Sequence, residues 1–189
     1  DIAAHHADAD LCIITGDLTE KGDVAAYEML KERLVRFPLE THLLLGNHDD
    51  RASYLKVFGG ADTNGHVQRA LTRQGLHLLF LDTLKGPPSS AGLYDAPRRS
   101  WLKARLQEAN GAPVYLFMHH PPFDIGHALM DLIKLDDAVA IAGGCANSSG
   151  RRAIGSSADL LVGFSSKELR GDYRQGDGRR EKREGNELG

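Results

Sequence analysis

Short apolar runs recur along roughly the first 140 residues, and polar or glycine-containing segments follow each of them. Apolar runs of about four to eight residues between turn residues are typical of buried strands. The pattern predicts five strands, at residues 10–15, 41–45, 66–71, 76–81 and 114–118. The run at 76–81 is apolar on both faces apart from His77, which predicts a strand in the middle of a sheet.

Helical patterns lie between and after these runs. They predict five helices, at residues 24–37, 52–58, 96–109, 127–134 and 136–142. We expect Asp23 to cap the first helix and Pro38 to end it. Asp95 and Pro97 are expected to start the third. The alternation of strands and helices predicts an α/β domain.

The composition changes after residue 142, which predicts a domain over residues 1–142 and a Gly/Ser-rich, charged tail over residues 143–189. In the last part, residues 165–189, 13 of 25 residues are charged and only Leu169, Tyr173 and Leu188 are sizeable apolar groups. Such a segment cannot bury enough apolar surface to offset its ordering entropy. We therefore expect disorder from about residue 165.

The bulk composition excludes several classes of function. Hydrophobic residues make up 41% of the chain and charged residues 26%, as in ordinary globular domains. The net charge of -3 argues against a nucleic-acid partner, and no apolar run is long enough to cross a bilayer. We therefore expect no membrane partner. Cys12 and Cys145 show no metal-type spacing, so we expect a reduced, cytoplasmic compartment.

Three polar motifs each follow an apolar strand. They are Gly16-Asp17, then residues 46–49 with the sequence Gly-Asn-His-Asp, then residues 119–122 with the sequence His-His-Pro-Pro. Taken singly, each could be no more than a turn or a rigid loop. Because functional groups gather at the carboxyl ends of strands in α/β sheets, their joint occurrence predicts one shared site.

The residue types indicate what this site does. The Asp17 carboxylate can bridge two cations, while Asn47 offers an amide oxygen and His119 an imidazole nitrogen. This set suits Mn, Fe, Co or Zn rather than Ca. Two such cations activate a water molecule and offset charge on phosphoryl oxygens. His48, beside a predicted ligand, could contact a phosphate oxygen or protonate the leaving group.

The motifs at residues 16–22, 44–49 and 118–122 resemble those of the calcineurin-like metallophosphoesterases. They are most similar to those of the bacterial class III cyclic-nucleotide phosphodiesterases and glycerophosphodiesterases, and the likeness covers about the first 140 residues. The resemblance implies an αββα sandwich of two mixed sheets. It also implies hydrolysis of a small phosphodiester by a metal-bound water, with a 3′,5′-cyclic nucleotide as the first choice of substrate.

The resemblance also assigns roles to single residues. Asp17 would bridge two divalent ions, Asn47 and His119 would be ligands, and His48 would be the catalytic histidine that contacts substrate. Glu20 matches a family acid that orients this histidine, so a Glu20–His48 hydrogen bond is expected. His120 is expected either to line the site or to brace its loop.

Two motifs of the family pattern are missing. The pattern opens with Asp-x-His and closes with Gly-His-x-His, and neither occurs in this chain. We therefore expect an incomplete domain, truncated at both ends, that lacks four ligands and holds one or both metal ions. The alternative function is a non-catalytic or strongly impaired fragment. If the chain is active, Asp49, Asp124 and His127 are the first candidates to replace the missing ligands.

Overall fold

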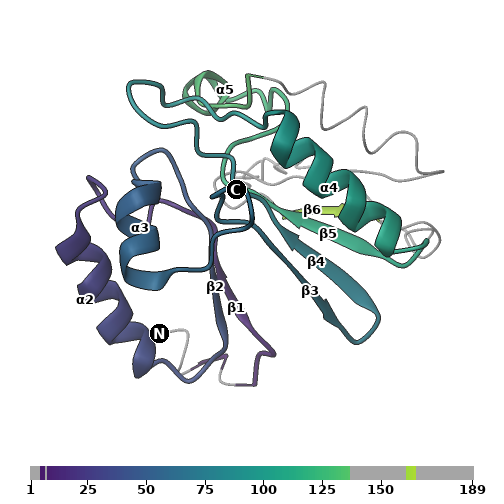
Figure 1. Ribbon diagram of the computed structural model, residues 1–189, viewed down its shortest axis with the longest axis horizontal. Coiled ribbons are helices and arrows are strands. Elements are labelled where there is room, and N and C mark those ends of the chain that lie inside the picture. Colours follow the sequence, from purple (N-terminus) through teal and green to yellow (C-terminus); the bar gives the residue numbers. More distant parts are fainter. Residues whose placement is uncertain (1–4, 7, 137–160, 165–189) are drawn as a thin grey trace, which may run out of the picture.

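The structure is a computed structural model that describes residues 5, 6, 8–136 and 161–164. Its strands form two sheets, one of two strands and one of four (Figure 1). The small sheet pairs β1 (Cys12–Ile14) with β2 (Thr41–Leu43) in parallel. The larger sheet contains, in spatial order, β3 (Arg69–Arg73), β4 (Leu76–Phe80), β5 (Val114–Phe117) and β6 (Leu161–Phe164).

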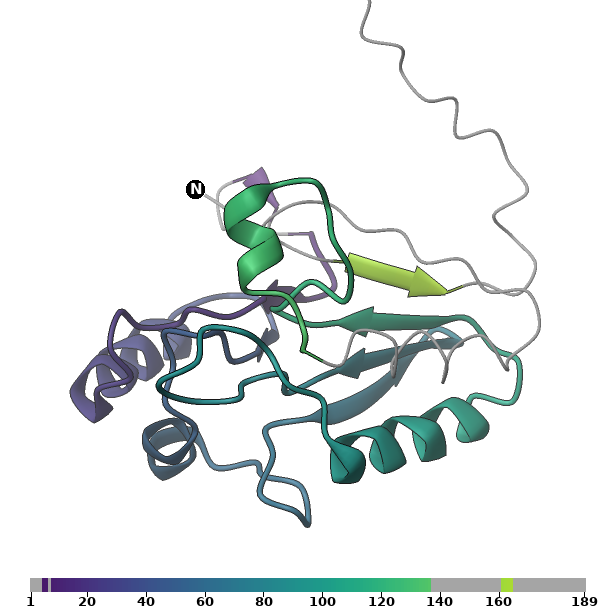
Figure 2. The ribbon, with the colours of Figure 1, turned by 90° about the horizontal axis from the view of Figure 1, so that it is seen from above.

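The larger sheet is mixed. Strand β4 pairs antiparallel with β3 and parallel with β5, and β6 lies antiparallel beside β5 (Figure 2). The central position predicted for residues 76–81 is thus confirmed. Strand β6 was not predicted, because its four residues lie inside the segment assigned to the tail.

Helices cover the outer face of each sheet, which gives the order helix, sheet, sheet, helix (Figures 1 and 2). On the small sheet lie α2 (Val24–Val35) and α3 (Arg51–Phe58), and on the larger sheet lies α4 (Ala96–Glu108). A short helix, α5 (Ala128–Leu132), follows the loop after β5. The expected α/β fold with an αββα sandwich is confirmed. None of the described helices is long and apolar enough to cross a membrane.

The core forms three layers because side chains alternate along the strands. At the end of β2 and just after it, Leu43 and Leu45 face α2 and α3, whereas Leu44 packs between the sheets against Phe80. In and after β4, Leu79 and Leu81 pack under α4. A chain that is apolar on both faces therefore supplies one layer on each side of its sheet.

The strand predicted at residues 66–71 is wrong at its start, since β3 begins only at Arg69. Side-chain carboxylates accept the backbone N–H groups of residues just before β3, so these groups do not pair with a strand. Asp62 accepts the backbone N–H of His66 at 2.9 Å, and Asp82 accepts that of Val67 at 2.8 Å. The predicted helix at 136–142 and the expected disorder from residue 165 concern residues outside the described part of the chain, apart from Asp136.

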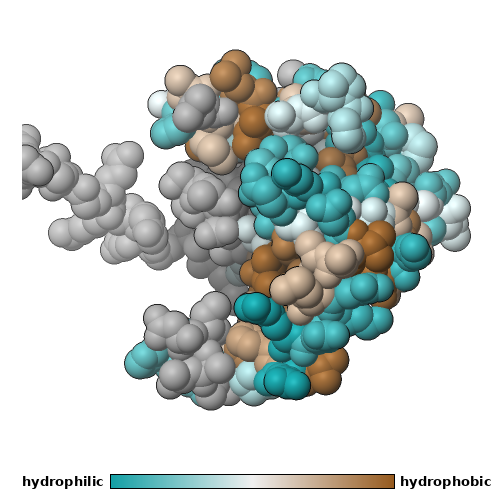
Figure 3. All heavy atoms as spheres, turned by 90° about the vertical axis from the view of Figure 1, so that its left-hand side faces the viewer, coloured by the Kyte–Doolittle hydropathy of each residue, from teal (hydrophilic) through white to brown (hydrophobic). Residues whose placement is uncertain are grey.

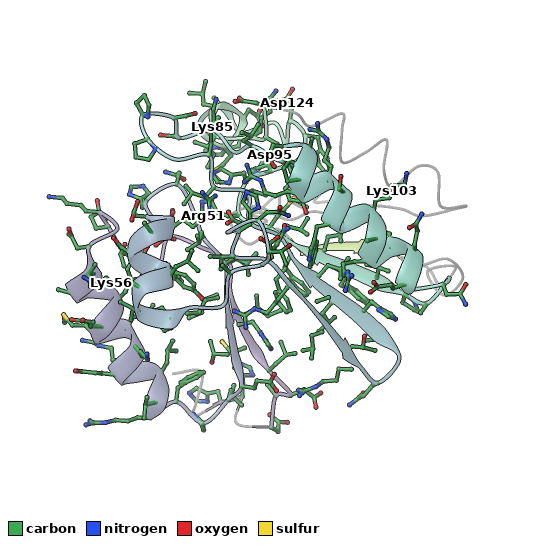
Figure 4. The ribbon with its side chains drawn as sticks, in the orientation of Figure 1. Arg51, Lys56, Lys85, Asp95, Lys103 and Asp124 are labelled. Carbon is green, nitrogen blue, oxygen red and sulfur yellow. The ribbon has the colours of Figure 1, made fainter. Side chains whose placement is uncertain are left out.

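A buried ion pair fixes the start of α3, directly after the motif at residues 46–49. Arg51 extends toward the centre of the molecule (Figure 4) and donates to both Asp82 oxygens, at 2.6 and 2.9 Å. Burial alone would raise the pKa of the Asp82 carboxyl, but the hydrogen bonds and charge of Arg51 lower it below its usual range. The loop that ends in Asp49 is thereby tied to the larger sheet.

Candidate metal centre

Asp17, Asn47 and His119 converge where the strands of both sheets reach their carboxyl ends. The Nε2 atom of His119 lies 3.2 Å from Asn47 Oδ1 and 3.5 Å from Asp17 Oδ1. The first two residues follow β1 and β2, whereas His119 follows β5 of the other sheet. The prediction that the three side chains approach one another is confirmed, and the site lies across the junction of the two sheets.

The proton on His119 is placed by the backbone. Its Nδ1 lies 3.0 Å from the Thr15 carbonyl oxygen, which can only accept, so Nδ1 carries the hydrogen. In the neutral ring, Nε2 then directs a lone pair at two further acceptor oxygens. A proton or a cation would relieve this crowding of acceptors, and the donor set suits a divalent first-row metal.

The described residues supply only part of a coordination shell. Within them, no three His, Cys, Asp or Glu side chains come together as a metal-binding group. The trio contains two such side chains, and the amide of Asn47 completes it. The chemistry therefore fits a cation, with fewer protein ligands than a closed two-metal site would need.

Two glycines allow this close approach. A Cβ atom on Gly16 would lie 2.5 Å from Nδ1 of His119, and one on Gly46 would lie 2.2 Å from Oδ1 of Asp17. Gly16 also has a φ of 123°, and Asp17 itself lies in the left-handed region with a φ of 52°. A side chain at either glycine would occupy the space of a predicted ligand.

Asp49 ties the first two loops of the site together. It is 4% exposed, and its two oxygens accept five hydrogen bonds. The donors are the backbone N–H groups of Leu18, Thr19 and Gly46 and the hydroxyls of Thr19 and Tyr27. Burial raises the pKa of the Asp49 carboxyl, and these donors oppose that rise.

Asp49 therefore does not act as a replacement ligand, because its lone pairs are committed to the protein. The other two candidates are also placed elsewhere. Asp124 forms an exposed ion pair with Lys134, and His127 is an exposed residue at the N-cap of α5. The expectation that one of these side chains completes the site is not supported by their positions.

We expect Asp49→Asn to destabilise the domain strongly. Both oxygens face donors only, so either orientation of an amide places its NH₂ group against an N–H or O–H. Each buried donor left unsatisfied costs about 1–3 kcal/mol. Urea unfolding should show a loss of ~3 kcal/mol for Asp49→Asn. Tyr27→Phe removes one of the donors to Asp49 and the acceptor of the Asp50 N–H, so it should show a smaller loss of about 1–2 kcal/mol. Equal midpoints for the two variants would contradict this role.

His48 is exposed and is held through its backbone and its ring. Its N–H donates to Asp17 Oδ1 at 3.1 Å, and its Nδ1 lies 3.2 Å from the carbonyl oxygen of Glu20. The expected hydrogen bond between the Glu20 carboxylate and His48 is therefore replaced by one to the Glu20 backbone carbonyl. The Glu20 side chain is exposed. Because a carbonyl only accepts, His48 Nδ1 carries a hydrogen and Nε2 remains for other contacts.

His120 braces the loop after β5. It is fully buried, and its Nδ1 lies 2.7 Å from the Thr83 hydroxyl. A Cβ on Gly92 would lie 2.5 Å from its ring, so the pocket around it is tight. Burial, and next the charge of His119, lower the pKa of His120 to about 3. His120 is thus a neutral packing group, and its ring meets that of His119 edge-on at 4.9 Å.

Comparison with known families shows a match over most of the described residues. The sequence model of the calcineurin-like phosphoesterases matches residues 1–144. That match contains all three polar motifs and every element up to α5. It leaves only β6 among the described strands outside the matched region.

Individual relatives agree with the family match. A probable cyclic nucleotide phosphodiesterase of Rhodopseudomonas palustris is 38% identical over 138 residues, which are 71% of this chain and 50% of the relative. A glycerophosphodiester phosphodiesterase of Enterobacter lignolyticus is 32% identical over 136 residues, 68% of this chain and 48% of its own. A cAMP/cGMP dual specificity phosphodiesterase of Mycobacterium tuberculosis is 31% identical over 137 residues, which are 70% of this chain and 43% of the relative. The chain spans about half the length of these curated relatives.

Proposed function

The chain belongs to the calcineurin-like phosphoesterases, and from that membership we propose that its site hydrolyses phosphodiesters, with 3′,5′-cyclic nucleotides as the substrate class. The observation that carries the proposal is the convergence of Asp17, Asn47 and His119 beside the exposed His48. The relatives named for cyclic nucleotides and for glycerophosphodiesters share a substrate chemistry, the phosphodiester monoanion.

In this proposal Asp17, Asn47 and His119 would hold a divalent cation such as Mn or Fe, and Asp17 would be the ligand shared with a second ion. A cation held by these residues would activate water and offset the charge of the phosphoryl oxygens. The Thr15 carbonyl keeps the proton of His119 on Nδ1, so Nε2 would be the ligating atom. Asp49 accepts the backbone N–H groups of Leu18 and Gly46 and so ties together the loops that carry Asp17 and Asn47.

His48 acts on the substrate. Its Nδ1–H is engaged with the Glu20 carbonyl, so the protonated ring presents its second N–H at Nε2. That group donates to a phosphoryl oxygen, and as the P–O bond to the leaving group breaks, the departing oxygen takes the proton from Nε2. Water forms the new P–O bond and releases one proton to solvent, a second solvent exchange returns a proton to Nε2 of His48, and the product is a phosphomonoester.

One observation favours a second candidate, a strongly impaired domain. The described residues bring together only two of the carboxylate and imidazole ligands that a two-metal site uses. A cation held by so few groups would bind weakly, and turnover would fall with it. The cytoplasmic location stays a prediction of the composition.

Hydrolysis of bis(p-nitrophenyl) phosphate and of cyclic AMP with added Mn tests the proposal. We expect Asp17→Asn and His119→Ala to lower Mn affinity, measured by calorimetry, and kcat/KM by more than about 100-fold, since even outer-shell changes cost ~10–100-fold. His48→Ala should lower kcat and leave Mn affinity unchanged. His127→Ala, also an exposed histidine, is the matched control and should change neither. Hydrolysis that survives Asp17→Asn would overturn the assignment.

A further inference from the structure

A pocket of about 590 Å³ lies between α2, α3 and the β2 strand, away from the metal centre. Its volume is in the range of small-molecule sites, about 300–1,000 Å³. Helix α3 separates the two features, because its first residue follows the motif at 46–50 and its last, Phe58, lines the pocket. The pocket is therefore distinct from the proposed catalytic site.

The charge of the pocket is positive. Lys31 and Arg69 line it, and among the residues that the structure describes no acidic side chain does. Lys31 Nζ donates to the Val57 carbonyl at 2.7 Å, and Arg69 contacts His42 Nδ1 at 3.4 Å. Within the part of the chain that the structure describes, neither cation forms an ion pair with a carboxylate. Two cations that face one hollow without an acid favour an anionic occupant.

The walls between these cations are apolar. Tyr54 is 2% exposed and its ring stacks on Phe58 at 4.9 Å. On the side of α2 and β2 the apolar lining residues are Leu34, Val35, Leu39 and Leu43. Figure 3 shows apolar side chains at the surface among hydrophilic ones on the face of the molecule that α2 and α3 form. An occupant would have to match both the charge and the apolar surface.

The entrance is open on the side of the turn after α3. Gly59 and Gly60 border the pocket, and a Cβ atom on either glycine would meet no atom within 4 Å. Their backbone is therefore accessible, and no side chain of this turn fills the hollow.

We propose that this pocket binds a small amphipathic anion, a carboxylate attached to an aromatic or aliphatic body. The carboxylate lies between Lys31 and Arg69, where charge-assisted hydrogen bonds are strongest. The body packs on Leu34, Leu39 and Phe58, which are partly exposed lining residues, and this contact removes apolar surface from water. This binding is independent of the phosphodiesterase proposal, because no residue of the pocket belongs to the metal centre.

Titration of the full chain with 4-phenylbutyrate, followed by amide NMR and calorimetry, tests the proposal. We expect shifts in the amides of residues 57–60 and 69 and saturable binding. The alcohol 4-phenylbutanol, which lacks the charge, should bind at least about tenfold more weakly, since a hydrogen bond to a charged group is worth roughly 10–100-fold in affinity. Acetate, which lacks the apolar body, should give no saturation.

Variants separate the pocket from general charge effects. Lys31→Gln and Arg69→Gln should each weaken phenylbutyrate binding by about 10–100-fold. Lys103→Gln on α4 (Figure 4) removes the same charge from another face and should have no effect. Asp17→Asn should also leave binding intact. Equal affinity for the alcohol, an equal loss in Lys103→Gln, or shifts confined to other residues would overturn the proposal, and circular dichroism confirms that each variant is folded.

Discussion

Replacement of Gly46 by alanine is expected to abolish cation binding at the metal centre. A Cβ at this position would lie 2.2 Å from Asp17 Oδ1 and 2.7 Å from His119 Cε1, so both proposed ligands must move apart. The backbone of Gly46 does not have the positive φ that disfavours other residues, so the new contacts alone cause the effect. We expect Mn affinity, measured by calorimetry, to fall by more than about 100-fold.

Gly60→Ala is the matched control for this prediction. Its Cβ meets no atom within 4 Å, but its φ is 83°, so alanine there should cost about 1 kcal/mol in the free energy of unfolding. Its Mn affinity should equal that of the unchanged chain. Retention of Mn binding in Gly46→Ala would mean that Asp17 and His119 do not share a cation.

The second large effect is expected from added ligands. A strand that ends in Asp-x-His, joined before residue 10, should raise Mn affinity and kcat/KM by more than about 100-fold. A Gly-His-x-His segment should raise both further, because catalysis by two metal ions requires that both ions are bound. The small sheet offers a place for the strand. Among the described residues β1 pairs only with β2, and a hollow of about 410 Å³ runs along residues 12–16.

A graft that ends in Asn-x-Ala separates pairing from ligation. It should protect the β1 backbone from hydrogen exchange as well as the Asp-x-His graft does, since the strand satisfies the same N–H and C=O groups. It should leave Mn affinity unchanged. If both grafts raise Mn affinity equally, the gain comes from order in the sheet, and the missing side chains are not ligands.

Sequence alone predicted the parts of the site that depend on strand ends. Asp17, Asn47 and His119 each follow an apolar run, and polar groups gather at the carboxyl ends of strands in α/β folds; that His119 comes from the second sheet was not predicted. It could not assign Asp49, because a carboxylate beside a ligand looks the same whether it binds metal or accepts N–H groups. The decision depends on donors such as Leu18 and Tyr27, which lie 31 and 22 residues away.

The same limit explains the smaller errors. The expected partner of His48 was the Glu20 side chain, but the loop presents the Glu20 carbonyl, and a backbone contact leaves no mark in residue type. Strand β3 begins later than predicted because the carboxylates of Asp62 and Asp82 accept backbone N–H groups that would otherwise be available to the sheet. Both effects arise from tertiary contacts that periodicity does not record.

The position of the site across two sheets has a mechanical consequence. Asp17 and Asn47 move with the small sheet and His119 moves with the larger one, and the layer of Leu44, Phe80 and Phe117 sets the spacing between them. A cation at the junction would hold the two sheets at one separation, because it binds tightly only at that separation. By linkage, it would stabilise the packed sandwich by an amount that rises with the ratio of its free concentration to its dissociation constant. The apolar layer and the cation would thus stabilise the same arrangement of the two sheets. A substitution that loosens the layer would lower the affinity for the cation, and removal of the cation would lower the stability of the packed layer.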